Sequence, residues 1–140
     1  MINIPIHIDY RSLLSSARNI AVVGLSPREE RPSNMVARYL IAVGYRVYPV
    51  NPGQSSILGL PCYGRLQDIP DTIDIVNIFR RSENVYPVVE AAVAIRAKAV
   101  WMQQGIINLE AADLAEKNGM TVIMDRCIKV EHAICFPFSS

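Results

Sequence analysis

The sequence predicts a single α/β domain over residues 1–140, built on a Rossmann-like, doubly wound parallel sheet of about five strands with helices on both faces. Short apolar runs rich in β-branched residues alternate with helical patterns along the chain, which is typical of successive βαβ crossovers. A length of 140 residues fits one domain. Apolar residues make up 51% of the chain and charged residues only 19%, a balance that favours strands buried on both faces.

The chain is expected to begin with a short helix at about 9–18, followed by a strand, a loop and a second helix. Residues 19–24 form a compact apolar run that is too short for a buried helix and ends at a glycine, so we interpret them as the first strand. Apolar side chains then recur on one helical face from Met35 to Val43. Ser33 or Asn34 is expected to cap the start of this helix.

The same alternation continues through the rest of the chain. A second strand over 45–50 stops at the turn Asn51-Pro52-Gly53. The segment 54–70 is less regular and is expected to hold a short strand near 62–63 and one helical turn near Leu66. The later elements are expected to be a strand over 73–79, a helix over 85–93, a strand over 99–103, a helix over 108–118, a strand over 120–124 and a partly helical tail over 125–140.

The composition argues against two classes of partner. The formal net charge is +1 and no block of basic residues occurs, so bulk attraction to nucleic acid is not indicated. No apolar run reaches the length of a membrane-spanning helix, and the N-terminus lacks the pattern of a signal peptide. We therefore expect a cytoplasmic protein, with its cysteines present as thiols whose spacing matches no zinc motif. These cysteines are Cys62, Cys127 and Cys135.

Polar residues follow four of the predicted strands. Ligands of open parallel sheets bind at the carboxyl ends of the strands, near the point where the strand order reverses. Gly, Ser, Asn, Gln and Arg, which contact phosphates and polar ligand edges, are gathered at these ends. The four segments are Gly24-Leu25-Ser26-Pro27, Asn51-Pro52-Gly53-Gln54, Phe79-Arg80-Arg81-Ser82 and Gln103-Gln104-Gly105.

The first of these segments predicts a phosphate site. Gly24 allows a sharp turn and the close approach of a ligand, and the N–H groups at the start of the next helix are expected to point toward it. Of Arg80 and Arg81, at most one is expected to face the ligand, since they are adjacent. The G-x-G-x-x-G pattern is missing, and Asn51 stands where NAD-binding proteins usually carry an acidic residue. Both departures weaken an NAD interpretation.

Residues suited to catalysis are few, so no catalytic residue and no metal site is predicted. Cys127 and His132 lie five positions apart, and a Cys–His pair can activate a thiolate. No third group that would orient such a pair is identifiable, so we favour an ordinary buried thiol beside a surface histidine. Trp101, Tyr39 and Tyr45 are interpreted as core residues.

The ordered motifs resemble those of small bacterial and archaeal CoA-binding proteins, which are similar to the N-terminal CoA-binding domain of the succinyl-CoA synthetase α subunit. The match runs from about residue 10 to residue 135. It is carried by Val23-Gly24-Leu25-Ser26, Arg31-Pro32-Ser33, Gly44-Tyr45-Arg46-Val47, Pro49-Val50-Asn51-Pro52, Phe79-Arg80, Val100-Trp101-Met102-Gln103 and Asp125-Arg126-Cys127.

This resemblance implies that coenzyme A binds in extended form across the carboxyl edge of the sheet. By the resemblance, Gly24, Leu25 and Ser26 lie along the pyrophosphate, and Ser33 adds an anchor at the helix start. Gln54 stands where the synthetase subunit has a lysine, which removes one positive charge. The other implied contacts are Asn51 and Pro52 at the nucleotide end, Phe79 and Arg80 along the adenine or pantetheine path, and the turn Gln103-Gln104-Gly105.

The function expected on these grounds is non-catalytic binding of CoA or an acyl-CoA by a carrier or regulatory module. One alternative is an enzyme, either an NAD(P)-linked oxidoreductase or a CoA-dependent transferase using Cys127. Another is an interaction protein that has kept the fold and lost the ligand. The sequence leaves open whether the chain forms a homodimer or binds a protein partner.

Overall fold

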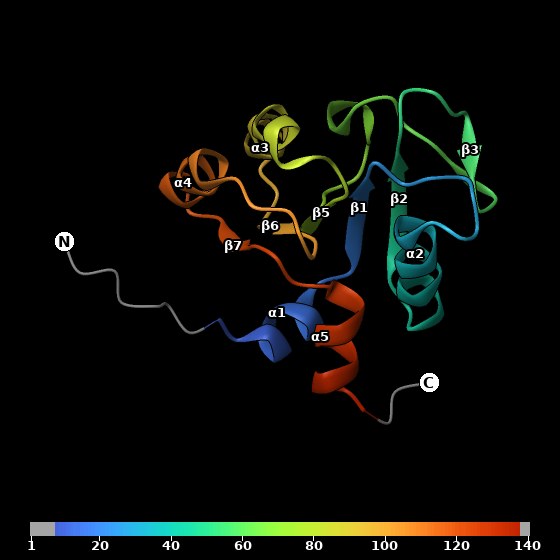
Figure 1. The fold of residues 1–140 in the computed structure, drawn as a ribbon, viewed down its shortest axis with the longest axis horizontal. Helices are drawn as coiled ribbons and strands as arrows, with labels where there is room; N and C mark the ends of the chain where they lie inside the picture. Colours follow the sequence, from blue (N-terminus) through green and yellow to red (C-terminus); the bar gives the residue numbers. More distant parts are fainter. Residues whose placement is uncertain (1–7, 138–140) are drawn as a thin grey trace.

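The computed structural model describes residues 8–137, and its elements alternate as the sequence predicts (Figure 1). His7, one of the two histidines, lies outside the described residues. The elements are α1 (Tyr10–Ser16), β1 (Asn19–Val23), α2 (Pro32–Ala42), β2 (Arg46–Val50), β3 (Ser56–Ile57), β4 (Leu60–Pro61), the 3-10 turn η1 (Leu66–Asp68), β5 (Ile75–Ile78), the 3-10 turn η2 (Ser82–Asn84), α3 (Val85–Ala94), β6 (Ala99–Met102), α4 (Leu109–Lys117), β7 (Thr121–Ile123) and α5 (Ile128–Cys135).

The main sheet has five parallel strands in the order β2-β1-β5-β6-β7. The chain passes from β1 to its neighbour β2, then crosses back to β5 on the other side of β1. The strand order therefore reverses between β1 and β5, and this switch point is where a doubly wound sheet offers a crevice to a ligand. The predicted fold class is confirmed.

Helices cover both faces of the sheet (Figure 1). Alternate side chains of each strand enter one of two cores, as the two-residue period of a strand requires. Val76 and Val100 pack in a core with α3 and α4, whereas Ile75 and Trp101 pack in a core with α1, α2 and α5. Because both faces of the sheet are buried, the strand sequences are near-continuous apolar runs. No helix among residues 8–137 is both long and apolar enough to cross a membrane.

The start of α2 differs from the prediction. The helix begins at Pro32, and its N-cap is Arg31, which makes no side-chain capping hydrogen bond. Proline suits the first position of a helix because it needs no N–H partner there. Ser33 and Asn34 therefore lie inside the first turn, and the prediction that one of them caps the helix is wrong. Their polar groups instead bond to the loop before the helix, as described below.

The irregular connection between β2 and β5 contains a small hairpin of β3 and β4. The short strand predicted near 62–63 lies slightly earlier, at Leu60–Pro61, and Tyr63 makes an isolated parallel bridge to Val50. The helical turn predicted near Leu66 is present as η1. The predicted partly helical tail contains α5, which packs against α1 and α2.

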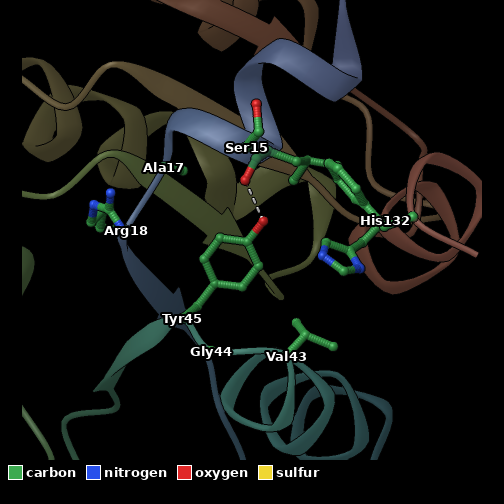
Figure 2. Close-up of a pocket in the computed structure, with 9 residues that line it drawn as sticks. Ser15, Ala17, Arg18, Val43, Gly44, Tyr45 and His132 are labelled. Atoms are coloured by element: carbon green, nitrogen blue, oxygen red, sulfur yellow. Dashed lines mark hydrogen bonds between the residues drawn. The ribbon is translucent and has the colours of Figure 1, made fainter. Parts of the chain in front are cut away.

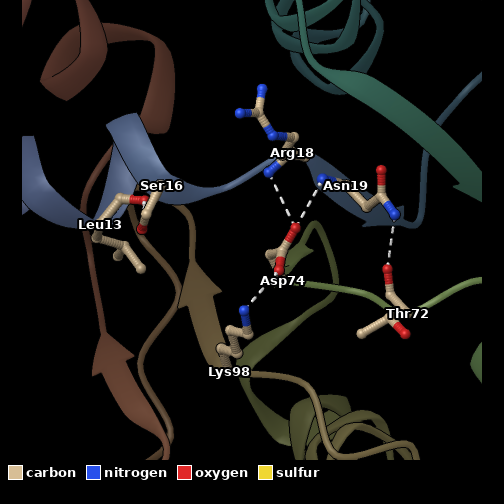
Figure 3. A network of polar contacts seen from close by, with 7 residues as sticks. All are labelled: Leu13, Ser16, Arg18, Asn19, Thr72, Asp74 and Lys98. Carbon is tan, nitrogen blue, oxygen red and sulfur yellow. Dashed lines mark hydrogen bonds and ion pairs between the residues drawn. The ribbon is translucent and has the colours of Figure 1, made fainter.

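Asp74 ties together the amino ends of the central strands (Figure 3). Its Oδ2 accepts hydrogen bonds from the backbone N–H groups of Arg18 and Asn19, both at 2.9 Å, and its Oδ1 lies 3.3 Å from Nζ of Lys98. Burial alone would raise the pKa of Asp74, but the two N–H groups and the ammonium hold that pKa below its usual value. This network is structural and lies at the edge opposite the switch point.

Candidate ligand-binding site

The switch point brings Gly24, at the end of β1, against Phe79 and Arg80, at the end of β5. The N–H of Gly24 donates to the Val50 carbonyl at 2.9 Å, and the N–H of Phe79 donates to the Val23 carbonyl at 2.8 Å. Gly24 has φ +87°, and a Cβ at this position would clash with the Phe79 carbonyl oxygen and stand 2.9 Å from Nη1 of Arg80. The glycine is thus needed by the backbone itself, whether or not a ligand approaches.

The turn after Gly24 is fastened to the first turn of α2. The Ser26 N–H donates to Oγ of Ser33 at 3.0 Å, and the Asn34 side-chain amide donates to the Ser26 carbonyl at 2.9 Å. Ser33 and Asn34 are buried and Ser26 is half-buried. Within residues 8–137 the N–H groups of Leu25 and Ser33 make no hydrogen bond, whereas Pro32 has no N–H and the N–H groups of Asn34 and Met35 donate to the Arg31 carbonyl. The turn and α2 therefore offer backbone donors in a fixed arrangement.

Asn51, at the end of β2, braces this turn from the other side. Its Nδ2 donates to the Leu25 carbonyl at 3.0 Å, and its Oδ1 accepts from the Gly53 N–H at 2.9 Å. Both side-chain groups of Asn51 are therefore used inside the protein. Pro52 and Gln54 are exposed on the outer part of the turn that follows β2. The Gln54 N–H donates to the Asn51 carbonyl at 3.3 Å.

Arg80 supplies a cation that is not neutralised by the protein. Its guanidinium makes no hydrogen bond or ion pair with any residue in 8–137, although the residue is half-buried. It lines a cavity of about 220 Å³ between the ends of β1 and β2 and helix α3. The neighbouring Arg81 is exposed and caps η2.

Sequence reasoning missed the far wall of this cavity, which is formed by Gly64, Arg65, Leu66, Pro87 and Val88. Arg65 pairs with Asp68 at 3.1 Å, so it differs from Arg80 in being compensated. The signal in the sequence is weak, because Gly64-Arg65 follows a single β-bridge at Tyr63 rather than a recognisable strand. It nevertheless forms a fifth polar segment at the carboxyl edge.

The turn after β6 is held differently. Gln103 is only 4% exposed, its N–H donates to the Ile78 carbonyl at 3.4 Å, and its Oε1 accepts from the Ile128 N–H at 3.0 Å. The Gly105 N–H donates to Oδ1 of Asp125 at 2.7 Å. Gln104 is exposed. This turn is therefore joined to the segment that leads into α5.

The predicted site residues fall into three groups. Gly24, Leu25, Ser26, Ser33, Asn51 and Arg80 form one connected cluster at the switch point, and Gln103, Gln104 and Gly105 form a second cluster one strand away. Pro52 and Gln54 lie on the outer rim. Phe79 is half-buried against the core beneath α2, so part of its ring is taken up by internal packing.

Cys127 and His132 do not form a surface dyad. His132 is 5% exposed, and the Tyr39 hydroxyl lies 2.7 Å from its Nδ1, so the prediction of a surface histidine is wrong. The cause is the packing of α5, which places the imidazole edge-on to Tyr39 and Tyr45. Burial lowers the pKa of His132. Trp101 is fully buried as expected, whereas the two tyrosines are half-buried beside the core.

His132 and Tyr45 also line a second cavity, of about 250 Å³, between the last turns of α1 and α2 (Figure 2). The Tyr45 hydroxyl donates to the Leu14 carbonyl, and burial, with smaller effects of Tyr39 and Cys135, raises the pKa of Tyr45 to about 12. No predicted site residue lines this cavity. Among residues 8–137, no group of three or more His, Cys, Asp or Glu side chains is arranged to hold a metal ion.

Comparison with known proteins gives the family. A family model described as a CoA binding domain matches residues 18–133. The chain belongs to the CoA-binding domain family. The match includes every predicted site residue, from Gly24 to Gly105, and all five strands of the main sheet.

Two relatives show how this CoA-binding domain occurs. An uncharacterized protein of Bacillus subtilis, YneT, is 43% identical over 130 residues, which cover 93% of this chain and 96% of YneT. An ADP-forming acetate–CoA ligase of Archaeoglobus fulgidus is 30% identical over 119 residues, and the match covers 78% of this chain but only 17% of the ligase. The chain therefore corresponds to a small part of that enzyme.

Solved structures agree with the fold. A hypothetical protein from Pyrococcus horikoshii matches with a TM-score of 0.91 and 38% identity, over 97% of this chain and 99% of that one. An acetyl-coenzyme A synthetase of Candidatus Korarchaeum cryptofilum, solved with phosphate and ADP, matches with a TM-score of 0.69 and 28% identity, over 76% of this chain and 25% of that one.

Proposed function

We propose that this chain binds CoA or an acyl-CoA at the carboxyl edge of the sheet, as a non-catalytic binding, carrier or regulatory module. The observation that carries the proposal is the half-buried, uncompensated guanidinium of Arg80 beside Gly24 at the switch point. A cation withdrawn from water without a partner is costly unless an anion meets it. The phosphates of CoA are such an anion.

In this proposal the phosphates lie between Arg80 and the start of α2. The donors are the N–H groups of Leu25 and Ser33 and the guanidinium, and the positive end of the helix dipole adds to their attraction. Gly24, Ser26 and Ser33 shape this site through the turn, and Asn51 positions Leu25. With a net charge of +1, the chain must rely on local geometry of this kind to hold a polyanion.

The rest of the ligand is proposed to follow the same edge. Pro52 and Gln54 would meet its nucleotide end, and Phe79 would flank the path toward β6. Gln103, Gln104 and Gly105 would line the pantetheine arm. The names of two relatives support the choice of CoA, since one is a ligase that joins acetate to CoA and another is an acetyl-CoA synthetase.

The observations give less support to the enzymatic alternatives. Asn51 occupies the end of β2, and its amide is bonded to Leu25 and Gly53, so no acidic acceptor for an NAD ribose stands there. The ligase match covers only 17% of that enzyme, so its activity is not assigned to this chain.

Thermal unfolding with added ligand tests the proposal. CoA at about 100 times its dissociation constant should raise the midpoint by about 5–10 °C, because it binds the folded state alone. NAD at the same concentration should leave the midpoint unchanged. The proposal is contradicted if millimolar CoA produces no shift, or if NAD stabilises the protein as strongly as CoA does.

A further inference from the structure

Asn77 is a polar residue in the middle of the main sheet. It lies on β5, opposite Val22 of β1 and Trp101 of β6, and its exposed fraction is 0%. Among the described residues 8–137, its Nδ2 and Oδ1 are the only buried side-chain nitrogen or oxygen atoms without a hydrogen-bond partner. An amide buried in this way costs free energy. A strand that served packing alone would therefore carry an apolar residue at this position.

The Asn77 side chain points to the face of the sheet that carries α1, α2 and α5. Side chains that lie opposite each other on neighbouring strands share a face. Val22 and Trp101, which flank Asn77, both belong to the core on the side of α1, α2 and α5. Val76 and Ile78, before and after it on β5, belong to the core on the side of α3 and α4. The unpaired amide thus lies on the same side of the sheet as the start of α2.

Phe79 and Gln103 form the next layer of side chains on this face, at the carboxyl edge. Phe79 follows Asn77 by two residues, and its N–H continues the ladder by donating to the Val23 carbonyl at 2.8 Å. Gln103 follows Trp101 by two residues on the neighbouring strand, so the alternation of a strand places it on the same side. Two residues of strand span roughly 7 Å. Asn77 is therefore one side-chain layer below the edge at which the ligand is proposed to bind.

We propose that Asn77 binds an amide group of the ligand, an inference that rests on the proposed CoA site. When CoA binds, the Phe79 ring turns aside, and the Asn77 carboxamide pairs with a secondary amide of the pantetheine arm. Nδ2 donates to the carbonyl oxygen of that amide, and Oδ1 accepts from its N–H. Phe79 is half-buried and follows the last residue of β5, so its ring can move without breaking the strand.

The two unpaired atoms of Asn77 define the chemistry of the group that would meet them. Nδ2 is a donor and Oδ1 is an acceptor, so a group that offers one acceptor beside one donor satisfies both. A secondary amide offers this pair, and the pantetheine arm contains two such amides. A phosphate offers acceptors alone and would place a negative charge against Oδ1. The geminal methyl groups of the arm offer neither a donor nor an acceptor.

The place of Asn77 in the strand order also favours the arm. The phosphates are proposed to lie at β1 and the start of α2, and the arm is proposed to pass from there to Gln103 at the end of β6. The strand β5 lies between β1 and β6, one strand spacing or roughly 5 Å from each, so the arm passes over Asn77. The adenine base offers a similar donor and acceptor, but its proposed place is near Asn51 at the end of β2, two strands from Asn77.

The test compares CoA with adenosine 3′,5′-bisphosphate, which has the adenine but no pantetheine arm, by calorimetric titration. Asn77→Leu should reduce CoA affinity about tenfold or more, the range for two lost hydrogen bonds between neutral groups, and should leave the affinity for the bisphosphate unchanged. Ile75→Val is the matched control, because Ile75 is fully buried on the same strand and the same face. It should leave both affinities unchanged. Without ligand, Asn77→Leu should unfold at a midpoint at least as high as that of the unmodified protein, because an unpaired amide is removed.

A second measurement requires no variant. In NMR spectra of the unmodified protein, CoA should shift the side-chain NH₂ signals of Asn77, and adenosine 3′,5′-bisphosphate should leave them in place. Three results would overturn the inference: Asn77 signals that CoA does not move, equal CoA affinities in Asn77→Leu and Ile75→Val, or equal losses of both ligands in Asn77→Leu. The second result, with a lowered midpoint, would assign Asn77 to a buried water. The third would place it at the adenine.

The titration of the unmodified protein with CoA separates this inference from the proposed function. If CoA binds and the Asn77 signals do not move, the inference fails while the proposed function stands. If CoA does not bind, the proposed function fails and the inference fails with it.

Discussion

Nη1 of Arg80 lies 2.9 Å from the point where a Cβ on Gly24 would stand. The relationship joins the ends of β1 and β5, the two strands between which the strand order reverses. It gives Gly24 two roles, since the glycine admits the Phe79 carbonyl and leaves the guanidinium free beside the turn. The structural role and the proposed binding role of this site can therefore be tested separately.

Replacing Gly24 should destabilise the fold. Gly24→Ala should lower the free energy of unfolding by about 2–5 kcal/mol, because the Cβ meets the Phe79 carbonyl and φ is +87°. Gly44→Ala is the matched control, with φ +105° but no atom within 4 Å of the added Cβ, and should lose only about 1–2 kcal/mol. Urea unfolding measures both. Equal losses would show that the approach of β5 to Gly24 is not the cause.

Removing the guanidinium should weaken ligand binding. Arg80→Ala should reduce CoA affinity by roughly 10- to 100-fold, the range for one lost hydrogen bond between charged groups. The loss should be larger for CoA than for dephospho-CoA if Arg80 meets the 3′-phosphate. Arg81→Ala, at the exposed neighbouring position, should bind CoA as the unmodified protein does. Calorimetric titration measures these affinities, and equal losses with both ligands in Arg80→Ala would place Arg80 away from the 3′-phosphate.

The buried imidazole of His132 should make stability depend on pH. Burial lowers its folded-state pKa, so the unfolded chain binds more protons as pH falls below about 6.5. Stability should therefore be full at pH 7.5 and lower at pH 5.5. His132→Gln should remove most of this change, since the chain has only one other histidine. A pH dependence unchanged in the variant would assign the effect to other groups. Urea midpoints at the two pH values provide the measurement.

Asp74 should also lower the stability toward acid pH, over a lower pH range than His132. Its folded-state pKa is lowered, so its contribution is present at neutral pH and is lost as pH falls below about 4. Asp74→Asn should lower the free energy of unfolding at pH 7 by about 1–3 kcal/mol, since the charged acceptor of two N–H groups is lost. Asp113→Asn, which breaks an exposed pair with Lys117, should have little effect. Similar losses in both variants at pH 7 would count against a structural role for the Asp74 network.

The sequence predicts the fold well because periodicity records burial. Ile75 and Val76 pack in opposite cores, so both side chains are apolar. The resulting short apolar run predicts the strand β5 without knowledge of the neighbouring strands. The strand ends are predicted equally well, since Gly24 and Arg80 follow the last apolar residue of a run. The sequence does not state the order of the strands in the sheet, and this order places Gly24 and Arg80 side by side.

The partners of polar side chains could not be predicted in the same way. Ser33 accepts a bond from Ser26, and Asn51 braces Leu25, because tertiary packing brings these groups within reach. Their residue types suit a ligand equally well, so the sequence cannot separate the two uses. His132 is buried because α5 lies against α1 and α2. The helical pattern of a short C-terminal segment does not predict which part of the protein this helix packs against.

Native mass spectrometry of the protein mixed with equimolar CoA and NAD tests the central claim most directly. We expect one CoA per chain and no NAD complex, with the CoA complex greatly reduced in Arg80→Ala and kept in Arg81→Ala. A spectrum with only the free chain, or with NAD bound as often as CoA, would contradict it.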